Sequence, residues 1–567
     1  MTRTLPLLLA ALVTGCPAPD PPAEPPTPAL PQYADAFTSV TLDGAAPAPL
    51  QLAVQACAGL RNRALGGSVF VAREASDTEW LTELDLQPSA TVDAADFLAS
   101  CVADTPCVRY DYADQQELLP SILTAATAVG AIPLDDGLGL SCTIALDAVD
   151  ALADAGTVED AARWALENHV GATSGLAMLN PGYQIDADDL SDPPLIHDMS
   201  AAMVDFVFSE RLFVTFFVNG CEDGHPQRAL LSDIVNNGVW QTPVGVYGYN
   251  DSWLVGGYLH EAQTRCLESA NMGAIPTKTG NLSFFSTRRA PITAPGVLQQ
   301  NPPEDLTYDP TKTYVAFIIG DGDNVRFIMS TRNVWLRQRL AACAEESSSC
   351  APLTWSISPH LPHLAPDVLE WYYARAEETA NDFFTLPPSG HTYAYPTSLN
   401  SADQDRFVAL TEADARLLDL STTVHWDWFE TWGDAEFVFL PKYARADGAI
   451  RGLFPVNVPY LFPTFPSWSS DEFFRVLAGA DGGRTVLFRP RQWRGINDDG
   501  DPFFQSPQRM ADELAGYPQG TVTGIYMTSD GGLSLENSFL ELVPLLPPHV
   551  EVVSADTAAR LALDATP

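Results

Sequence analysis

The chain has few positively charged side chains. Its 30 Lys and Arg residues stand against 72 Asp and Glu residues, which gives a net charge of -42. The only lysines are Lys278, Lys312 and Lys442. A surface of this charge repels the phosphate backbone of nucleic acids and anionic lipid headgroups. Nucleic acid is therefore excluded as a partner, and membrane attachment is expected only through a covalent N-terminal lipid anchor.

Long apolar runs are missing as well. After residue 13 no run reaches the roughly 18 apolar residues that a membrane-spanning helix needs. The short run Leu5–Val13 follows Arg3, as in a secretory signal. It ends in Leu12-Val-Thr-Gly-Cys16, which resembles the bacterial lipobox. We expect Cys16 to carry lipid and to become the new N-terminus, with an ordinary signal cleaved nearby as the alternative.

The first residues also set the expected organisation of the chain. The proline-rich segment 17–35 cannot pack a core and is typical of an extended tether. The prediction is a lipoprotein signal peptide at 1–16, a linker at 17–35, an N-terminal α/β region of two or three subdomains at 36–305, and a barrel-like domain at 306–567. The expected location is extracytoplasmic, on a bacterial outer membrane or cell surface. The sequence leaves the oligomeric state open.

Cys-x-x-Cys pairs are absent, so a zinc ribbon or a thioredoxin-like site is not expected. If Cys16 is lipidated, eight of the nine cysteines remain, an even number that suits an oxidising compartment. Cys101–Cys107 and Cys343–Cys350 are close enough to pair across short loops. The other four are assigned as Cys57–Cys142 and Cys221–Cys266, although their spacing does not determine this pairing.

From about residue 308, short β-rich runs alternate with amphipathic stretches. Strands are expected at 314–319, 353–358, 382–386, 420–424, 450–454, 485–488, 522–527 and 550–553, and helices at 324–340, 365–377, 401–418, 471–477 and 508–514. Alternation every 30–40 residues or so is typical of βα units around a parallel sheet. The predicted fold class is α/β, with a C-terminal (β/α) barrel-like domain of seven or eight strands after smaller α/β domains. An open doubly wound sheet is the alternative.

Polar and aromatic residues follow the predicted strands, at the barrel face where parallel barrels place their chemistry. The candidates are Asp321, Asp323 and Asn324 after the first strand, Ser389, Tyr393 and Tyr395 after the third, Asp427 and Trp428 at the fourth, Arg489 after the sixth, and Asp530 after the seventh. Aromatic rings stack on sugar faces, while carboxylates and amides bind hydroxyls. The structural alternatives to these binding roles are a helix-capping turn at 321–324 and tryptophans that pack in the core.

Two carboxylates on opposite sides of a cleft can hydrolyse a glycosidic bond. We assign one of them to Asp321 or Asp323 and the other to Asp427 or Asp530. Mutual repulsion between Asp321 and Asp323 should raise one pKa, so the first strand supplies the acid. The remaining candidates, Asn324, Ser389, Tyr393, Tyr395, Trp428 and Arg489, should bind the sugar. No cofactor or metal is expected, since His360 and His363 are only weak metal signals.

Four segments occur in a characteristic order: Asp321-Gly-Asp-Asn324, Trp355-Ser-Ile-Ser-Pro359, 365–373, and Pro388-Ser-Gly-His-Thr-Tyr-Ala-Tyr-Pro396. This series resembles the bacterial GxGYxYP family of glycoside hydrolases. Segments 58–63 and 280–283 are similar too, so the resemblance covers about residues 50–550. One departure is Thr392, where the family has its second motif glycine. If the glycine of the relatives has a positive φ, Thr392 must adopt a different backbone conformation from theirs.

The resemblance implies export and a role in carbohydrate chemistry. The expected function is a cell-surface glycoside hydrolase that acts on poly- or oligosaccharides by carboxylate acid/base chemistry. One alternative is a glycan-binding lipoprotein without turnover. The other is a metal-dependent hydrolase resembling polysaccharide deacetylases, in which Asp321 or Asp323 would ligate the metal together with His360.

Overall fold

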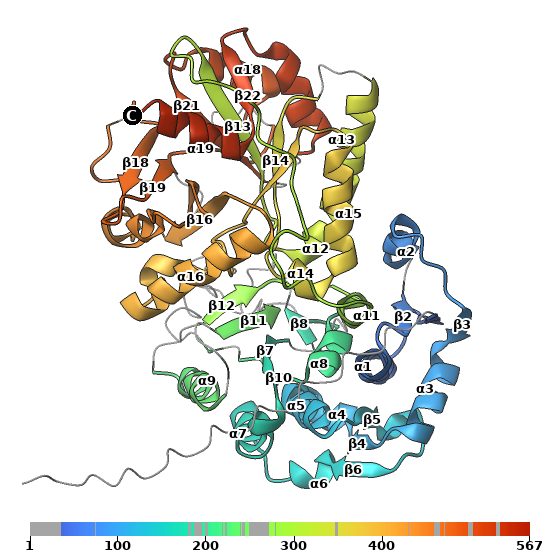
Figure 1. The fold of residues 1–567 in the computed structure, drawn as a ribbon. Helices are drawn as coiled ribbons and strands as arrows, with labels where there is room; N and C mark the ends of the chain where they lie inside the picture. Colours follow the sequence, from blue (N-terminus) through green and yellow to red (C-terminus); the bar gives the residue numbers. More distant parts are fainter. Residues whose placement is uncertain are drawn as a thin grey trace, which may run out of the picture.

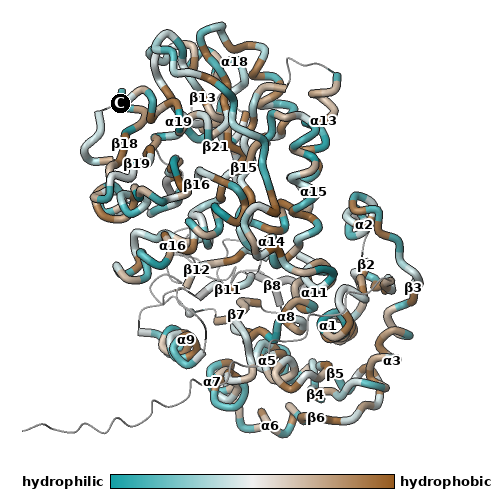
Figure 2. Tube along the Cα trace, viewed as in Figure 1, coloured by the Kyte–Doolittle hydropathy of each residue, from teal (hydrophilic) through white to brown (hydrophobic). Residues whose placement is uncertain are grey.

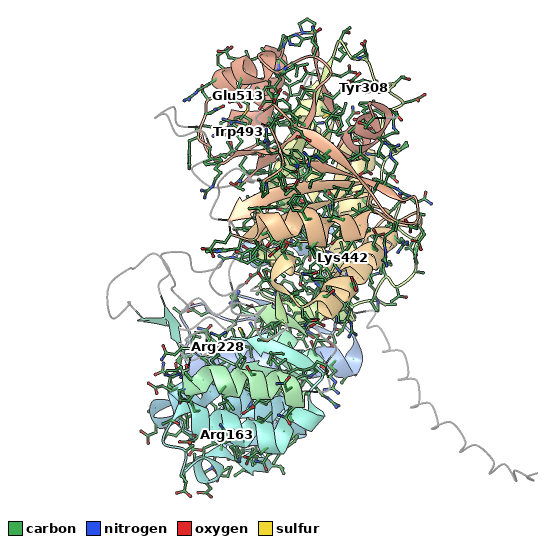
Figure 3. All side chains as sticks on the ribbon, turned by 90° about the vertical axis from the view of Figure 1, so that its left-hand side faces the viewer. Arg163, Arg228, Tyr308, Lys442, Trp493 and Glu513 are labelled. Carbon is green, nitrogen blue, oxygen red and sulfur yellow. A yellow bond between two sulfur atoms is a disulfide. The ribbon has the colours of Figure 1, made fainter. Side chains whose placement is uncertain are left out.

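The structure is a computed structural model. It describes residues 36–73, 75–179, 183–185, 196–198, 202–217, 219–220, 224–238, 240, 244–248, 272–277, 279–345, 350–428, 430–458, 465–469, 471–496, 503–528 and 533–566. The described residues form a mixed α/β fold with several parallel sheets, which confirms the predicted class. Two lobes follow one another along the chain (Figure 1), and they are also distinct in the side view (Figure 3). Within the described ranges, no helix is long and apolar enough to cross a membrane.

The N-terminal lobe contains three parallel sheets. They are β2-β1-β3 (Val69–Ala72, Thr38–Thr41, Ala90–Asp93), β5-β4-β6 (Ile132–Asp135, Cys107–Tyr110, Ile144–Asp147) and β10-β7-β11-β12 (Leu212–Thr215, Gly175–Met178, Val244–Gly248, Met272–Ile275). A short antiparallel pair, β8 (Tyr183–Ile185) and β9 (Ile196–Asp198), accompanies them. The main helices are α1 (Ala48–Leu65), α3 (Ala94–Asp104), α5 (Leu119–Val129), α7 (Val158–His169), α8 (Val204–Glu210), α9 (Pro226–Asn237) and α11 (Leu282–Thr287). The sheets agree with a lobe built from small α/β units.

The two N-terminal motifs of the family resemblance meet in one buried hydrogen-bond network. Asn62 on α1 donates through Nδ2 to the Val69 carbonyl at 2.9 Å and to Ser283 Oγ at 2.8 Å. Ser283 Oγ donates to Asp205 Oδ2 at 2.7 Å. Asn281 Nδ2 donates to the Val71 carbonyl at 2.9 Å. These hydrogen bonds hold strand β2 against α1, α8 and α11. Losing one of them would leave a buried polar group without a partner, which destabilises the fold.

The disulfides correct part of the predicted pairing. Cys57 is linked to Cys101 and Cys107 to Cys142, so the predicted pairs Cys101–Cys107 and Cys57–Cys142 are wrong. Cys101 lies on α3 and packs toward α1, whereas Cys107 starts β4 in another sheet. Cys101 and Cys107 are only six residues apart in sequence, but α3 and β4 place them in different layers of the lobe. The pair Cys343–Cys350 is confirmed. Cys16, Cys221 and Cys266 lie outside the described residues.

The C-terminal lobe contains two sheets. The first has the order β15-β14-β13-β21-β20, in residues Asp382–Thr385, Leu353–Ser356, Thr313–Ile319, Val522–Met527 and Arg491–Trp493, and β22 (Val550–Val553) also pairs with β13. The second has the order β16-β17-β19-β18, in residues Thr422–Trp428, Gly452–Val458, Arg484–Phe488 and Phe474–Ala478. All eight predicted strands are present. The helix predicted at 471–477 is wrong, because β18 pairs there antiparallel with β19.

The strand ladders of the described residues do not close into a barrel. The two sheets meet at a single bridge between Leu386 and Thr423. The predicted eighth strand, β22, pairs with the first half of β13 on the edge that β14 uses further along, instead of closing a ring beside β21. Pro490 separates β19 from β20 and has no N–H for a ladder. The parallel α/β arrangement is thus present, while barrel closure stays a prediction.

Helices surround both sheets. They include α12 (Val325–Phe327), α13 (Asn333–Glu345), α14 (Leu361–Leu364), α15 (Pro366–Glu377), α16 (Ser401–Leu417), α18 (Pro507–Ala515) and α19 (Ala555–Asp564). A π-helical turn, Ile328–Arg332, joins α12 to α13. All seven residues of β13 are buried, as in a strand covered on both faces. The tube in Figure 2 mixes teal and brown along helices such as α9 and α16, as expected for amphipathic helices.

Candidate active site

The loop after β13 brings Asp321 and Asp323 to the carboxyl end of the sheet. Gly322 lies so close to β14 that an added Cβ would be 2.0 Å from the Ser356 carbonyl oxygen. Asp321 has a φ of 60°, in the left-handed region. Asn324 caps α12, because its Oδ1 accepts a hydrogen bond from the Arg326 amide at 3.0 Å. Asn324 thus caps the helix, and its predicted sugar contact stays a prediction.

Asp321 is paired with a buried arginine. Arg332 Nη2 donates to Asp321 Oδ2 at 2.9 Å and to the Gly320 carbonyl at 2.8 Å. The Arg332 side chain is only 3% exposed and its guanidinium lies 4.4 Å from the Trp335 ring centroid. The π-helical turn Ile328–Arg332 places this side chain under the loop, a position that a regular helix would shift.

Asp323 is the most unusual carboxyl of the lobe. Asp323 is 9% exposed, and its carboxyl makes no hydrogen bond to any other described residue. Burial, followed by the negative charge of Asp321, raises the pKa of Asp323 to about 8. Asp323 is therefore protonated at neutral pH, and the predicted difference between the two carboxyls of this loop is present in the structure.

Asp323 lines a small cavity of about 10 Å³, the space of about one water molecule, at the ends of β13, β14 and β15. His360, His391, Thr392 and Tyr393 also line it, and Ala274 and Pro276 from the end of β12 complete the wall. His360 is neutral, since burial and the neighbouring His391 lower its pKa to about 3. Its Nε2 lies 2.7 Å from the His391 carbonyl oxygen, which can only accept, so Nε2 carries the hydrogen.

His391 forms a pair with Asp414 on α16. The distance from His391 Nδ1 to Asp414 Oδ2 is 2.7 Å. Burial raises the pKa of Asp414, and His391 opposes that shift. The ring centroids of His360 and His391 are 5.2 Å apart. Neither member of this pair was predicted as a site residue. His391 follows the third predicted strand, and Asp414 lies within an amphipathic helix whose sequence shows no sign of function.

Thr392 fits above a glycine of the other lobe. Its Oγ1 is buried and has no hydrogen-bond partner in the described structure. An added Cβ at Gly273 would be 2.2 Å from this oxygen. The backbones of Ala274 and Tyr393 exchange two hydrogen bonds of 2.9 Å, which joins the motif loop to β12. Among the described residues Thr392 is not one of those with positive φ, whereas Gly390 has a φ of 102°.

The candidate Asp427 is engaged in contacts within the protein. Asp427 is fully buried and accepts hydrogen bonds from Thr431 Oγ1 at 2.6 Å, the Trp428 amide at 3.1 Å, His425 Nε2 at 3.0 Å and Thr397 Oγ1. Asp427 does not line the cavity of Asp323. This set of donors occupies both carboxylate oxygens, so the structure does not bring Asp427 together with Asp323.

The remaining predicted sugar contacts divide in the same way. Ser389 Oγ donates to the Ala394 carbonyl at 2.7 Å and accepts from the Trp426 amide at 2.8 Å, which holds the motif loop on β16. Tyr393 lies on the cavity wall, whereas Tyr395 is fully buried with its ring centroid 6.1 Å from that of Trp428. Arg489 donates to the Ser469 carbonyl at 3.0 Å, away from the lining residues. Asp530 lies outside the described residues.

No metal centre is formed by the described side chains. In these ranges no group of three or more His, Cys, Asp or Glu residues is arranged to hold an ion. The described site therefore consists of a buried acid, a neutral histidine and a histidine–aspartate pair. Groups of this kind transfer protons.

The fold and this site define an α/β protein with acid–base residues at the carboxyl edge of a parallel sheet. Residues 311–458 match the family described as the GxGYxYP putative glycoside hydrolase C-terminal domain. The match contains the Asp321–Asn324 loop, the motif loop 388–396 and Asp414, and it confirms the family resemblance over that segment. No curated protein matches the chain.

One of three similar solved structures shares the fold. A protein from Bacteroides thetaiotaomicron, described as a putative hydrolase, has a TM-score of 0.68 and 17% identity, and the match covers 96% of this chain and 99% of that one. A putative polysaccharide deacetylase from Mycobacterium smegmatis has a TM-score of 0.28 and 14% identity, over 46% and 94% of the two chains. The 4-alpha-glucanotransferase of Thermococcus litoralis has a TM-score of 0.30 and 12% identity, over 44% and 40%. Only the first score is high enough to support a common fold.

Proposed function

We propose that the protein is a lipid-anchored, extracytoplasmic glycoside hydrolase that acts on poly- or oligosaccharides. The observation that carries the proposal is Asp323, a buried carboxyl on a cavity wall without a hydrogen bond to another described residue. A buried polar group without a partner lowers the stability of the fold, so its presence indicates a functional role. The family match over residues 311–458 supports a glycoside as substrate. The signal-like N-terminus supports the location.

Hydrolysis of a glycosidic bond needs a proton on the departing oxygen. Because the pKa of Asp323 is about 8, this carboxyl keeps a proton at neutral pH and can deliver it. Asp321 assists from its place beside Arg332, since its negative charge keeps the neighbouring proton bound. Tyr393, on the same wall, is buried and packs against Trp426 with 5.3 Å between the ring centroids, so it shapes the cavity wall.

The proposal is tested by a hydrolysis screen of the full chain against poly- and oligosaccharides, read as new reducing ends. Asp323→Asn preserves the size of the side chain and removes the acid. We expect it to bind glycans normally and to lose about 10²–10⁴-fold in kcat. Asp154→Asn, an exposed position far along the chain from the site, is the matched control. Normal hydrolysis by Asp323→Asn would overturn the assignment, and binding of glycans without turnover by the wild type would favour a glycan-binding lipoprotein.

A further inference from the structure

We propose that His391, oriented by Asp414, is the general base of the site and works opposite the acid Asp323 in a single displacement at the sugar carbon. The inference rests on the proposed function and adds the identity of the base and the stereochemical course. It departs from the expectation of two carboxylates, because Asp427 is occupied by four donors from the protein.

The histidine–aspartate pair fixes the tautomer of His391. The Asp414 carboxylate lies 2.7 Å from Nδ1 and accepts its hydrogen bond, so Nδ1 carries the hydrogen when the imidazole is neutral. Nε2 then has a free lone pair, and it hydrogen-bonds to no residue in the described part of the chain. A carboxylate that holds one nitrogen and stabilises the imidazolium is the arrangement by which serine hydrolases prepare their base.

One helix and one neighbouring ring hold the base in place. Thr411 and Asp414, both on α16, contact the two ends of the residue: the His391 amide donates to Thr411 Oγ1 at 3.2 Å, and Nδ1 meets Asp414. The His391 carbonyl accepts from His360 Nε2. Gly390 is required beside it, because an added Cβ would be 2.5 Å from Thr411 Cγ2 at a φ of 102°. These contacts determine the ring position before substrate arrives.

The charges around His391 suit proton uptake. Asp414 on α16 contacts its Nδ1, and His360 at the end of β14 lies beside its ring. Asp323 lines the same cavity from the end of β13 and lies near the charge of Asp321. His360 is uncharged and Asp323 is protonated at neutral pH, so neither opposes or neutralises an imidazolium strongly. Asp414 is the group in this set that favours the charged ring.

The proton transfers of the proposed reaction balance. His391 Nε2 takes a proton from water as the water oxygen bonds to the anomeric carbon. The bond from that carbon to the glycosidic oxygen breaks, and the oxygen receives the Asp323 proton. The site is left with an imidazolium and a carboxylate, which return to the starting state by proton exchange with solvent. Direct attack by water on one face inverts the configuration of the sugar.

The test compares three variants on a substrate that the wild type hydrolyses. His391→Gln should lower kcat by about 10²–10⁴-fold with little change in KM. Asp414→Asn should lower kcat less, because the amide still contacts the ring but no longer supplies the negative charge that stabilises the imidazolium. His363→Gln is the control: its Nε2 pairs with Glu210 at 3.6 Å, and it is not among the cavity residues. Thermal melts establish that each variant is folded.

Two further readouts separate a base from a structural histidine. Added imidazole should restore part of the activity of His391→Ala, and the first product released by the wild type should show the inverted anomer by NMR. A retained anomer, or a His391→Gln enzyme with normal kcat, would overturn the inference while leaving the proposed function in place. If the wild type hydrolyses no glycoside while Asp323 and His391 variants are folded, both fail together.

Discussion

At the scale of single residues, the partners of a carboxyl decide its role. Asp323 and Asp427 both lie at the carboxyl ends of strands in the C-terminal lobe, and their local sequence contexts do not distinguish their roles. In the structure, Asp427 accepts four hydrogen bonds, whereas Asp323 faces a cavity without a partner among the described residues. The first arrangement stabilises a loop, and the second leaves a group free to react.

The raised pKa of Asp323 predicts a pH-dependent cost in stability. The pKa is 3.8 for the free side chain and about 8 in the folded protein, so the unfolded chain loses this proton first. The stability of the wild type should therefore fall as pH rises through the window from about 4 to 8. Asp323→Asn removes the ionisation and should gain on the order of a few kcal/mol at pH 8 relative to pH 4. Melting curves of both proteins at the two pH values measure this difference, and an equal gap at both would contradict the buried-acid assignment.

A second prediction concerns Thr392 and Gly273. Gly273→Ala places a methyl group 2.2 Å from Thr392 Oγ1, so the motif loop must move. We expect a loss of about 1–3 kcal/mol in the free energy of unfolding. Adding Thr392→Gly should recover part of this loss, because the two residues occupy one space and their effects are not additive. Gly44→Ala, with open space around its Cβ, is the control. Additive effects in denaturant melts would refute the direct contact.

At the scale of elements, the last helix explains how two sheets share one core without a closed ladder. The buried small side chains of α19, among them Ala558 and Ala559, join a single core with inward residues of both sheets, such as Ile318 of β13 and Phe454 of β17. Helix α19 packs against β13, β21, β17 and β19. Packing of side chains thus connects the sheets where hydrogen bonding between strands does not.

This packing predicts that α19 tolerates no enlargement on its inner face. Ala559 lies against β17, where an added Cβ at Gly452 would be only 2.9 Å from Ala559 Cβ. Ala559→Leu should destabilise the protein by about 1–3 kcal/mol through overpacking. Asp564→Leu, at an exposed position of the same helix, should change stability by less than about 0.5 kcal/mol. Chemical denaturation measures both, and equal effects would show that α19 is not packed as described.

At the scale of the whole molecule, the cavity draws on both lobes. Ala274 and Pro276 come from the N-terminal lobe, while the acid and the histidines come from the C-terminal one. Side-chain contacts lock the two together: Arg289 Nη2 donates to Glu370 Oε1 at 2.7 Å, and Trp80 Nε1 donates to the Met329 carbonyl at 2.7 Å. In Figure 1, β12 lies beneath the strands of the upper lobe, next to α14 and α16. The N-terminal lobe is therefore part of the site and not only a spacer.

Anchoring of the whole molecule remains a prediction from the first residues. Cys16→Ala removes the residue that would carry lipid, so the protein should move from the membrane fraction to the soluble fraction. Immunoblots of both fractions, with the wild type and a Cys221→Ala variant as controls, measure this change. Unaltered membrane association would show that the N-terminus is not lipidated. The strong negative charge makes retention by surface electrostatics alone an unsuitable explanation.

The local pattern was sufficient for the class of fold and for one half of the site. Buried strands and amphipathic helices have periods of their own, so eight of the C-terminal strands and the parallel α/β class were predictable, whereas β18 and β20 were not. Asp321 and Asp323 follow the first strand directly, and their repulsion was predictable from two residues of separation. The segment 471–477 misled the prediction because pairing with β19, which depends on a distant strand, overrode its helical pattern.

Tertiary structure alone decided the rest. His391 and Asp414 are 23 residues apart, and only the packing of α16 under the motif loop brings them to 2.7 Å. The burial of Asp323, the place of β22 beside β13, and the partners of Cys101 and Cys107 likewise depend on contacts between distant segments. The sequence by itself determined which residues follow each strand, since that order is covalent. Which of those residues lose water, meet a charge or share a cavity was decided by the fold, because burial and electrostatic interaction depend on distance in space.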